Sequence, residues 1–476
     1  MSNAIDRVQK IIIAFAVLIF AITVCQNFAL LNNPSIYILI IIAVCAFCLL
    51  IYKVKISPKI LIISILSFGF ILRFVFILVV QTHINSDFAI MFDAAKKVAV
   101  GNFSCFDISY FQNWAYQTPF VLYQGLILKL FGSVFILKFL NVCFMTGIIF
   151  LIYLFARKIV SERAAAVAAF LYAIYPAPIL LASVLTNQHI STFLIYLGIY
   201  MMLRKNDIRT LVISGVLLSL GNLMRPEGII VIATILFVSL ILILKCATAK
   251  DRIDILKKAG IVLVTYFLIL ASVGFAIKIA GINKNGISNK FPEWKFIGGL
   301  DNTTFGQYNK KDTYILDIKD QNLRRKEALK IIENSFKKGN GVIDFVYKKT
   351  SKMWACNESS FSTVFKNDSN YKNHVMDFKT NERKATGLMM YFDKSIYIFI
   401  FIAFIFSCIL IILNKSKLKE KAFFFIVMIS INYAVYLLIE IKTRYRYNIM
   451  PAIFIMSAAS FILFEKINLK RKTKKT

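Results

Sequence analysis

The residue best placed to do chemistry in this chain is a carboxylate beside a long apolar run. Asp87 is the first acidic residue after the run 60–80, and an ionisable group at a lipid boundary is costly enough to suggest a function. Partial desolvation there makes a carboxylate a better proton acceptor, so Asp87 is a candidate general base. The alternative is a solvated helix cap. Asp93, six residues later, lies about 240° round a helix, which favours a solvated position over substrate binding.

Two arginines in the stretch TRYRY are candidate phosphate ligands. Arg444 and Arg446 precede the last apolar run, on the side where basic residues are unusual. A guanidinium group offers paired donors to phosphate oxygens, and the neighbouring Tyr445 can stack or donate. The alternative is an interfacial belt of aromatic and cationic side chains.

Further charged residues lie at other ends of apolar runs. Arg225 and Glu227 flank Pro226 in a turn between two runs, where they either pair with each other or face an active site. Arg73 lies near the middle of its run, so it needs a carboxylate partner or a water-filled cavity. A structural ion pair between helices is the favoured interpretation for Arg73.

Polar and aromatic residues near these charges are candidate sugar ligands. Tyr116 and Gln117, with Trp114, precede a short apolar stretch, and such groups bind sugars by stacking and hydrogen bonding. Trp114 fits an aromatic belt equally well. His189 begins another run and either contacts substrate or serves as a capping or interfacial histidine, which is the more frequent case.

The elements that must position these residues are membrane helices. The chain has 476 residues, of which 58% are hydrophobic and only 17% charged, with a mean hydropathy of +0.69. These values exclude an ordinary soluble globule. Apolar runs occur at about 11–31, 36–52, 60–80, 134–156, 164–180, 187–203, 210–224, 227–244, 259–279, 395–413, 422–440 and 449–464. We therefore expect an all-α polytopic membrane protein of about twelve spans, with the first run kept as an anchor.

The basic residues set the expected orientation. The net charge is +32, but Lys and Arg gather in every second loop between spans and in the tail, which the positive-inside rule places in the cytoplasm. Both termini are then cytoplasmic and no nucleic-acid partner is implied. The same alternation makes the short apolar stretch 119–132 an interfacial helix at the outer face.

Two long segments then face the exterior, 81–133 and 281–394. The second carries 21 Lys and Arg against 13 Asp and Glu, and helical spacing predicts a helix over 321–338. We expect a small extracytoplasmic α or α+β domain at 281–394, between a membrane module at 1–280 and the helices and basic tail of 395–476. Its positive charge either attracts an anionic polymer or headgroup or is an ordinary solvated surface.

The cysteines and histidines give no metal pattern. Six of the eight cysteines lie in or at the ends of apolar runs, and only Cys105 and Cys356 are expected outside. Those two either pair or, as we favour, remain free thiols. There is no His or Cys cluster with metal spacing, no phosphate-binding glycine loop and no serine nucleophile elbow.

Several motifs together resemble a known family. The stretches SDFAIMFDAAKKVAVGN and YFQNWAYQTPFVLYQGLILKLFG, then RPEG at 225–228 and TRYRYNIMP at 443–451, are similar to polyprenyl-phosphate-sugar-dependent glycosyltransferases of family 39, which have the GT-C fold. In that family, which includes protein O-mannosyltransferases and aminoarabinose transferases of lipid A, the first outer loop carries an acidic motif after a span that often holds an arginine. Arg73 and Asp87 match this pattern.

The chain departs from the family at two positions. The acidic pair of the family is often Asp-Glu, but here Phe88 follows Asp87. Many relatives carry an acid after the threonine at 186, where this chain has Asn187 and Gln188. A divalent metal therefore stays an open question.

The resemblance implies an inverting membrane glycosyltransferase. It would move one sugar from a polyprenyl-phosphate donor to an acceptor hydroxyl of an envelope glycan, lipid or protein on the outer face of a bacterial cell membrane. Asp87 is expected as base, and the donor phosphate is assigned to Arg444, Arg446 and Arg225. Substrate contacts are assigned to Asp93, Gln117, Tyr116, His189, Glu227 and Tyr445. The alternatives are a flippase of lipid-linked saccharides and a non-catalytic subunit of an envelope assembly complex.

Overall fold

The computed structural model of the protein describes residues 2–80, 82–338, 341–365, 382–413 and 418–461. Within these ranges the chain is helical and contains no strand, which confirms the all-α prediction. Seven helices are long and apolar enough to cross a membrane: Ile5–Ala29, Pro34–Lys53, Pro58–Val79, Val134–Ala156, Gly228–Lys245, Ala249–Ile279 and Thr386–Leu413. Shorter apolar helices occupy Ile208–Met224, Ala422–Leu438 and Met450–Phe461.

The N-terminal half consists of long helices and one helical loop within 82–133, which we call the outer loop after the location expected from its sequence. The first three helices are α1 (Ser2–Ala29), α2 (Pro34–Lys53) and α3 (Pro58–Val79), and the outer loop holds α4 (Ser86–Ala99), α5 (Ser109–Asn113) and α6 (Thr118–Phe131). Then follow α7 (Val134–Ala156), α8 (Glu162–Ile174), α9 (Pro176–Leu181), α10 (Gln188–Arg204), α11 (Ile208–Met224), α12 (Gly228–Lys245) and α13 (Ala249–Ile279). The stretch 119–132 forms a helix, as predicted, and α6 packs against α4.

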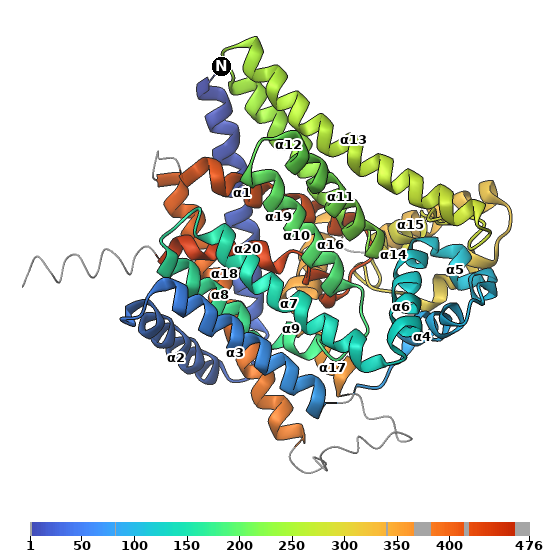
Figure 1. Ribbon diagram of the computed structural model, residues 1–476, viewed down its shortest axis with the longest axis horizontal. Coiled ribbons are helices and arrows are strands. Elements are labelled where there is room, and N and C mark those ends of the chain that lie inside the picture. Colours follow the sequence, from blue (N-terminus) through green and yellow to red (C-terminus); the bar gives the residue numbers. More distant parts are fainter. Residues whose placement is uncertain (1, 81, 339–340, 366–381, 414–417, 462–476) are drawn as a thin grey trace, which may run out of the picture.

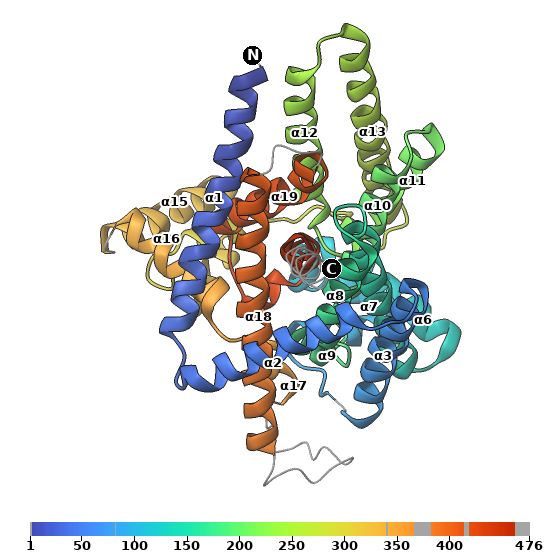
Figure 2. The same ribbon diagram turned by 90° about the vertical axis from the view of Figure 1, so that its left-hand side faces the viewer.

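The stretch 281–394, which we call the outer segment after the location expected from its sequence, and the C-terminal helices complete the fold. The outer segment contains α14 (Trp294–Leu300), α15 (Gln321–Lys338), α16 (Val342–Thr350) and α17 (Ser360–Val364), so the helix predicted over 321–338 is confirmed. The chain continues with α18 (Glu382–Leu413), α19 (Leu418–Leu438) and α20 (Met450–Ser457). Figure 1 shows α4, α5 and α6 beside α14 and α15, and Figure 2 shows α12 and α13 extending together away from α9 and α17.

One predicted span is broken. The run 164–180 divides into α8 and α9 at Tyr175, which has an extended backbone (φ −66°, ψ 119°) before Pro176. Proline lacks an amide N–H and disfavours helical geometry in the residue before it, so the helix ends there. By length and composition, the described residues therefore provide fewer full-length spans than the twelve expected.

The break between α8 and α9 explains how the buried charge of Arg73 is compensated. The fully buried Arg73 guanidinium donates to the carbonyls of Ala173 (2.8 Å) and Tyr172 (3.1 Å) at the end of α8, and to Gly69 (3.0 Å) within α3. The C-terminus of a helix carries unpaired carbonyls and partial negative charge. Among the described residues Arg73 has no carboxylate partner, so the predicted interhelical ion pair is replaced by a cation that caps a helix end.

Cys105 and Cys356 are both free thiols. Cys105 is buried and its Sγ lies 3.7 Å from the carbonyl of Ala94. The structure therefore agrees with the free-thiol interpretation of these two residues.

Candidate active site

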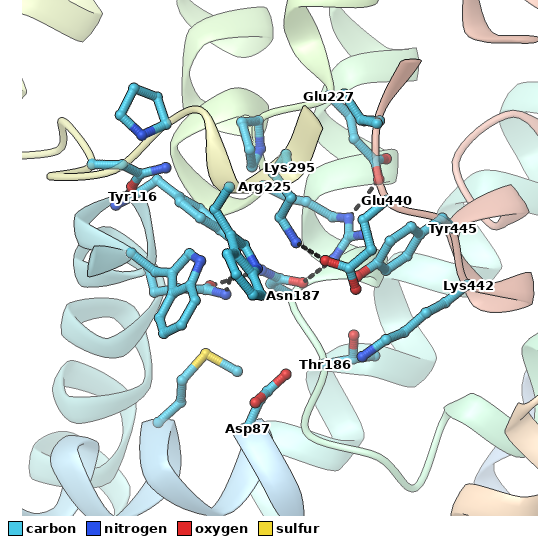
Figure 3. Close-up of a pocket in the computed structure, with 18 of the residues that line it drawn as sticks. Asp87, Tyr116, Thr186, Asn187, Arg225, Glu227, Lys295, Glu440, Lys442 and Tyr445 are labelled. Carbon is cyan, nitrogen blue, oxygen red and sulfur yellow. Dashed lines mark hydrogen bonds and ion pairs between the residues drawn. The ribbon is translucent and has the colours of Figure 1, made fainter. Parts of the chain in front are cut away.

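A cavity of about 920 Å³ lies where the outer loop, the outer segment and three helix ends meet. Its lining comes from the stretches 86–91, 110–119, 186–187, 222–227, 287–308 and 436–445. Figure 3 shows that charged side chains from these distant stretches point into one space. Of the site residues predicted from the sequence, seven line it: Asp87, Tyr116, Gln117, Arg225, Glu227, Arg444 and Tyr445.

Asp87 enters the cavity from the first turn of α4 and is half-buried. The preceding Ser86 has a φ of +54°, in the left-handed region that L-residues seldom adopt, and such backbone conformations gather at functional sites. No hydrogen bond or ion pair joins the Asp87 carboxylate to another described residue, so it does not cap α4. Burial, and after it the charge of Asp87, raise the pKa of the Tyr110 hydroxyl, which places that tyrosine in the field of the carboxylate.

Two cations of the cavity are compensated by carboxylates. Arg225 Nε donates to Glu227 Oε1, and Lys295 Nζ lies 3.0 Å from Glu440 Oε2. Burial by itself lowers the pKa of Arg225, but the charges of Glu227, Tyr436 and Tyr445 and the hydrogen bond to Glu227 together outweigh burial and raise that pKa, so Arg225 stays protonated. The predicted pairing of Arg225 with Glu227 is therefore present, and both residues also line the cavity.

Two other cations of the cavity have no ion-pair partner among the described residues. Arg444 places its guanidinium 4.9 Å from the ring centre of Phe88, and its backbone carbonyl accepts a 2.6 Å hydrogen bond from Gln188 Nε2. Phe88, which follows Asp87 where the family resemblance suggested a second acid, supports the Arg444 cation through its ring face. Lys442 extends across the cavity toward Thr186 (Figure 3).

A chain of hydrogen bonds runs from one compensated pair to the outer loop. Arg225 Nη1 donates to Asn187 Oδ1 (3.3 Å), and Asn187 Nδ2 donates to Gln117 Oε1 (3.3 Å). Gln117 Nε2 in turn donates to the Tyr116 hydroxyl (3.2 Å). At the position where the family resemblance suggested an acid, the Asn187 amide bridges an acceptor and a donor without adding charge.

Arg446 lies outside the cavity. It is 3% exposed, and its guanidinium contacts Glu358 Oε2 (2.8 Å), the Tyr397 hydroxyl (2.9 Å) and the carbonyl of Thr443 (3.0 Å). The stretch Thr443–Arg446 is a 3-10 helix, in which residues two apart point about 240° from each other. Arg444 therefore faces the cavity while Arg446 is buried in a structural ion pair.

Asp93 and His189 also lie away from the cavity. Asp93 is exposed and pairs with Lys96 at 2.6 Å, about 240° round α4 from Asp87. His189 is fully buried, with Nδ1 2.6 Å from the Tyr447 hydroxyl and Nε2 2.8 Å from the carbonyl of Leu181. Asp93 thus matches the solvated alternative, whereas His189 is not interfacial but a buried residue that bonds to the last carbonyl of α9.

Sequence reasoning missed Lys295, Glu440, Lys442 and Asn187 as site residues. Glu440 was detectable, because it is an acidic residue at the end of an apolar run, as Asp87 is. Lys295 had no local signal within a segment rich in lysine. In the ranges that the structure describes, no group of three or more His, Cys, Asp or Glu side chains is arranged to hold a metal ion.

Comparison with known proteins relates this geometry to a family. Residues 117–274, about a third of the chain, match the family described as dolichyl-phosphate-mannose-protein mannosyltransferase. This stretch includes Gln117, Asn187, Arg225 and Glu227, whereas Asp87 and Arg444 lie outside it. No curated protein matches the chain.

A solved structure similar to this one is the archaeal oligosaccharyltransferase AglB from Archaeoglobus fulgidus, in complex with an inhibitory peptide and a dolichol-phosphate. The TM-score is 0.49 at 14% sequence identity, and the similarity covers 87% of this chain. The match covers 51% of AglB, so the chain spans about half of that protein. The family match over residues 117–274 confirms the resemblance to polyprenyl-phosphate-sugar-dependent glycosyltransferases of the GT-C type that the sequence motifs predicted.

Proposed function

We propose that this protein is a multi-pass membrane glycosyltransferase that transfers one sugar from a polyprenyl-phosphate carrier to an acceptor hydroxyl on the extracytoplasmic face. The observation that carries the proposal is the joining, in one cavity, of an unpaired carboxylate, Asp87, with two cations that have no ion-pair partner among the described residues, Lys442 and Arg444. A general base and a clamp for a departing phosphate are the two parts that this chemistry needs.

The proposed reaction is a single displacement with inversion at the anomeric carbon. The acceptor hydroxyl oxygen forms a bond to that carbon while the bond from the carbon to the phosphate oxygen breaks. The proton of the hydroxyl passes to the Asp87 carboxylate, and the electron pair leaves with the polyprenyl phosphate. Lys442 and Arg444 bind the phosphate oxygens, so their charges offset the charge that develops on the leaving group.

The arrangement of the cations supports a revised phosphate subsite. Arg446 is committed to Glu358, and withdrawing it from that buried partner would leave an unpaired carboxylate. Lys442 supplies the second uncompensated charge in its place. Arg225 keeps a secondary role, because Glu227 offsets its charge and Asn187 holds one of its nitrogens.

The proposal is tested by transfer from defined donors. Purified full-length protein in lipid nanodiscs is given a panel of polyprenyl-phosphate hexoses and pentoses with an extracted envelope fraction that provides glycan, lipid and protein acceptors. We expect label to move from the donor to an acceptor, with release of polyprenyl phosphate, and Asp87→Asn to slow both by about 10²- to 10⁴-fold.

Two outcomes would overturn this function. If the intact donor crosses the proteoliposome membrane at the same rate with the unmodified protein and with Asp87→Asn, and no sugar is transferred, the protein is a flippase. If the purified protein neither transfers the sugar nor moves the donor, and transfer occurs only after other envelope proteins are added, the protein is a non-catalytic subunit of an assembly complex.

A further inference from the structure

One wall of the cavity is aromatic and uncharged. It is formed by the outer loop and the outer segment, and we call it the outer wall; its side chains are Tyr110, Trp114, Tyr116, Asn289, Trp294 and Tyr308. Tyr110 and Trp114 lie against each other with ring centres 5.2 Å apart, and Trp294 and Tyr308 are 6.5 Å apart. Flat apolar ring faces beside amide and hydroxyl groups match the alternating apolar and hydroxylated surface of a sugar ring.

The charges of Lys295 and Arg225, next to Tyr116 of the outer wall, are compensated by ion pairs. Lys295 is paired with Glu440, and Arg225 is paired with Glu227. Figure 3 shows Tyr116, Arg225 and Lys295 on one side of the cavity, with Asp87, Thr186 and Lys442 on the other. The side near the outer wall thus offers donors and acceptors together without net charge, which favours a neutral polyhydroxyl ligand over an anion.

The outer wall is fixed before any ligand binds. Asn283 Nδ2 donates to the carbonyl of Phe111 (3.3 Å) and to Thr118 Oγ1 (3.0 Å), and Asn285 Nδ2 donates to Gln112 Oε1 (3.0 Å). The Tyr116 amide donates to Asn289 Oδ1 at 3.3 Å. These bonds join two segments about 170 residues apart in the sequence, so little ordering free energy is needed when a ligand binds.

We infer that the outer wall is the acceptor subsite and that it takes a neutral saccharide, whose hydroxyl is presented to Asp87. This inference rests on the proposed function and narrows its acceptor from glycan, lipid or protein to a glycan. The sugar of the donor has the same chemistry, but it is tied to the phosphate and so must lie within reach of Lys442 and Arg444. A free saccharide that binds beside an occupied phosphate subsite is therefore an acceptor.

Binding to the outer wall is measurable without transfer. Purified full-length protein in nanodiscs is titrated with cellobiose, lactose and chitobiose, and separately with glucose 6-phosphate and a serine-containing hexapeptide, while tryptophan fluorescence is recorded. Of the three tryptophans, Trp114 and Trp294 line the cavity, whereas Trp354 is buried against Phe20. We expect at least one neutral disaccharide to change the fluorescence in a saturable way, in Trp354→Phe as in the unmodified protein.

Variants identify the binding surface. Tyr308→Ala and Trp114→Leu are expected to weaken disaccharide binding by roughly three- to tenfold each, the value of one aromatic contact. Tyr314→Ala is the matched control, because Tyr314 is similarly exposed (49% against 51% for Tyr308) in the same segment but does not line the cavity. Saturating farnesyl phosphate, which occupies the phosphate subsite alone, is expected to leave disaccharide affinity unchanged.

Three outcomes would overturn the inference. The first is that the hexapeptide or glucose 6-phosphate binds in preference to every neutral disaccharide. The second is that Tyr308→Ala and Trp114→Leu leave disaccharide binding unchanged. The third is that disaccharide and farnesyl phosphate compete, which would assign the outer wall to the donor sugar. Disaccharide binding is measured without any transfer step. If a disaccharide binds but no donor supports transfer, the proposed function is refuted while the saccharide site at the outer wall remains.

Discussion

Lys295 and Glu440 are joined twice, through the backbone and through their side chains. The amide of Glu440 donates to the carbonyl of Lys295 at 2.8 Å, and Lys295 Nζ lies 3.0 Å from Glu440 Oε2. Nearby, the buried Lys349 Nζ donates to the carbonyls of Leu437 (2.9 Å) and Ile439 (3.0 Å) and also contacts that of Gly299. The outer segment thereby fixes the stretch 439–445, which carries Lys442 and Arg444 into the cavity.

The closeness of this contact can be tested with two adjacent glycines. A Cβ at Gly299 would overlap the carbonyl oxygen of Leu438, whereas one at Gly298 would meet only Glu440 carbons at 3.6 Å. We expect Gly299→Ala to displace the stretch 439–445 and lower kcat/KM for transfer by about tenfold or more, while Gly298→Ala stays near the unmodified value. Steady-state transfer kinetics measure both variants. Equal kinetics in the two would show that this contact does not set the positions of the cations.

Asp87→Asn should remove the proton acceptor without changing the shape of the cavity. We expect kcat to fall by about 10²- to 10⁴-fold, the usual contribution of a general base, with donor affinity within a factor of about three. Asp93→Asn is the matched control, since Asp93 belongs to the same helix but is exposed and paired with Lys96. A similar loss in both variants would point to a role for α4 itself and not for the Asp87 carboxylate.

Arg444 and Arg446 should respond differently to removal of the guanidinium group. Arg444→Ala is expected to weaken binding of the donor and of farnesyl phosphate by about tenfold or more, with little change in thermal stability, because Arg444 has no ion-pair partner among the described side chains. Arg446→Ala leaves Glu358 buried and unpaired, which costs about 3–5 kcal/mol. Ligand binding and thermal denaturation, measured on both variants, separate the two roles. Loss of phosphate affinity in a stable Arg446→Ala protein would return that residue to the phosphate subsite.

Arg73→Met should destabilise the protein and leave the site chemistry unchanged. The substitution keeps an apolar chain of similar length but removes the donor of the Ala173 carbonyl and leaves the Tyr172 carbonyl only a 3.4 Å bond from the Tyr175 amide. A buried group left without its partner costs about 1–3 kcal/mol. Thermal denaturation should therefore occur at a lower temperature, while farnesyl phosphate affinity stays the same. Arg157→Met, at an exposed residue whose contact with Glu162 is 4.0 Å, provides the control. If Arg73→Met is as stable as the unmodified protein, the backbone carbonyls at the end of α8 find other hydrogen-bond donors, and Arg73 is not needed to cap the helix.

Much of the site could be predicted from residue type and position. Asp87, Arg225 and Arg444 were identifiable because charged groups at the ends of apolar runs are rare and costly, and they do meet in one cavity. Arg446 could not be separated from Arg444, because only the 3-10 geometry of Thr443–Arg446 turns the two apart. Lys295 depends on the folding of the outer segment against the end of α19, which no local pattern records. The partners of Arg73 could not be predicted for a similar reason. They are backbone carbonyls that are free to accept hydrogen bonds because the helix ends before Pro176.

The division of the cavity among distant stretches has a consequence for biosynthesis. Asp87 and half of the outer wall (Tyr110, Trp114 and Tyr116) precede α13 in the sequence and are made first, whereas Lys442 and Arg444 are made only after the outer segment. A chain inserted only as far as α13 would hold the carboxylate without the cations that bind phosphate. Donor binding would then begin only after α19 and the stretch 439–445 have docked on the outer segment, so a partly inserted chain would not draw on the pool of lipid-linked sugar.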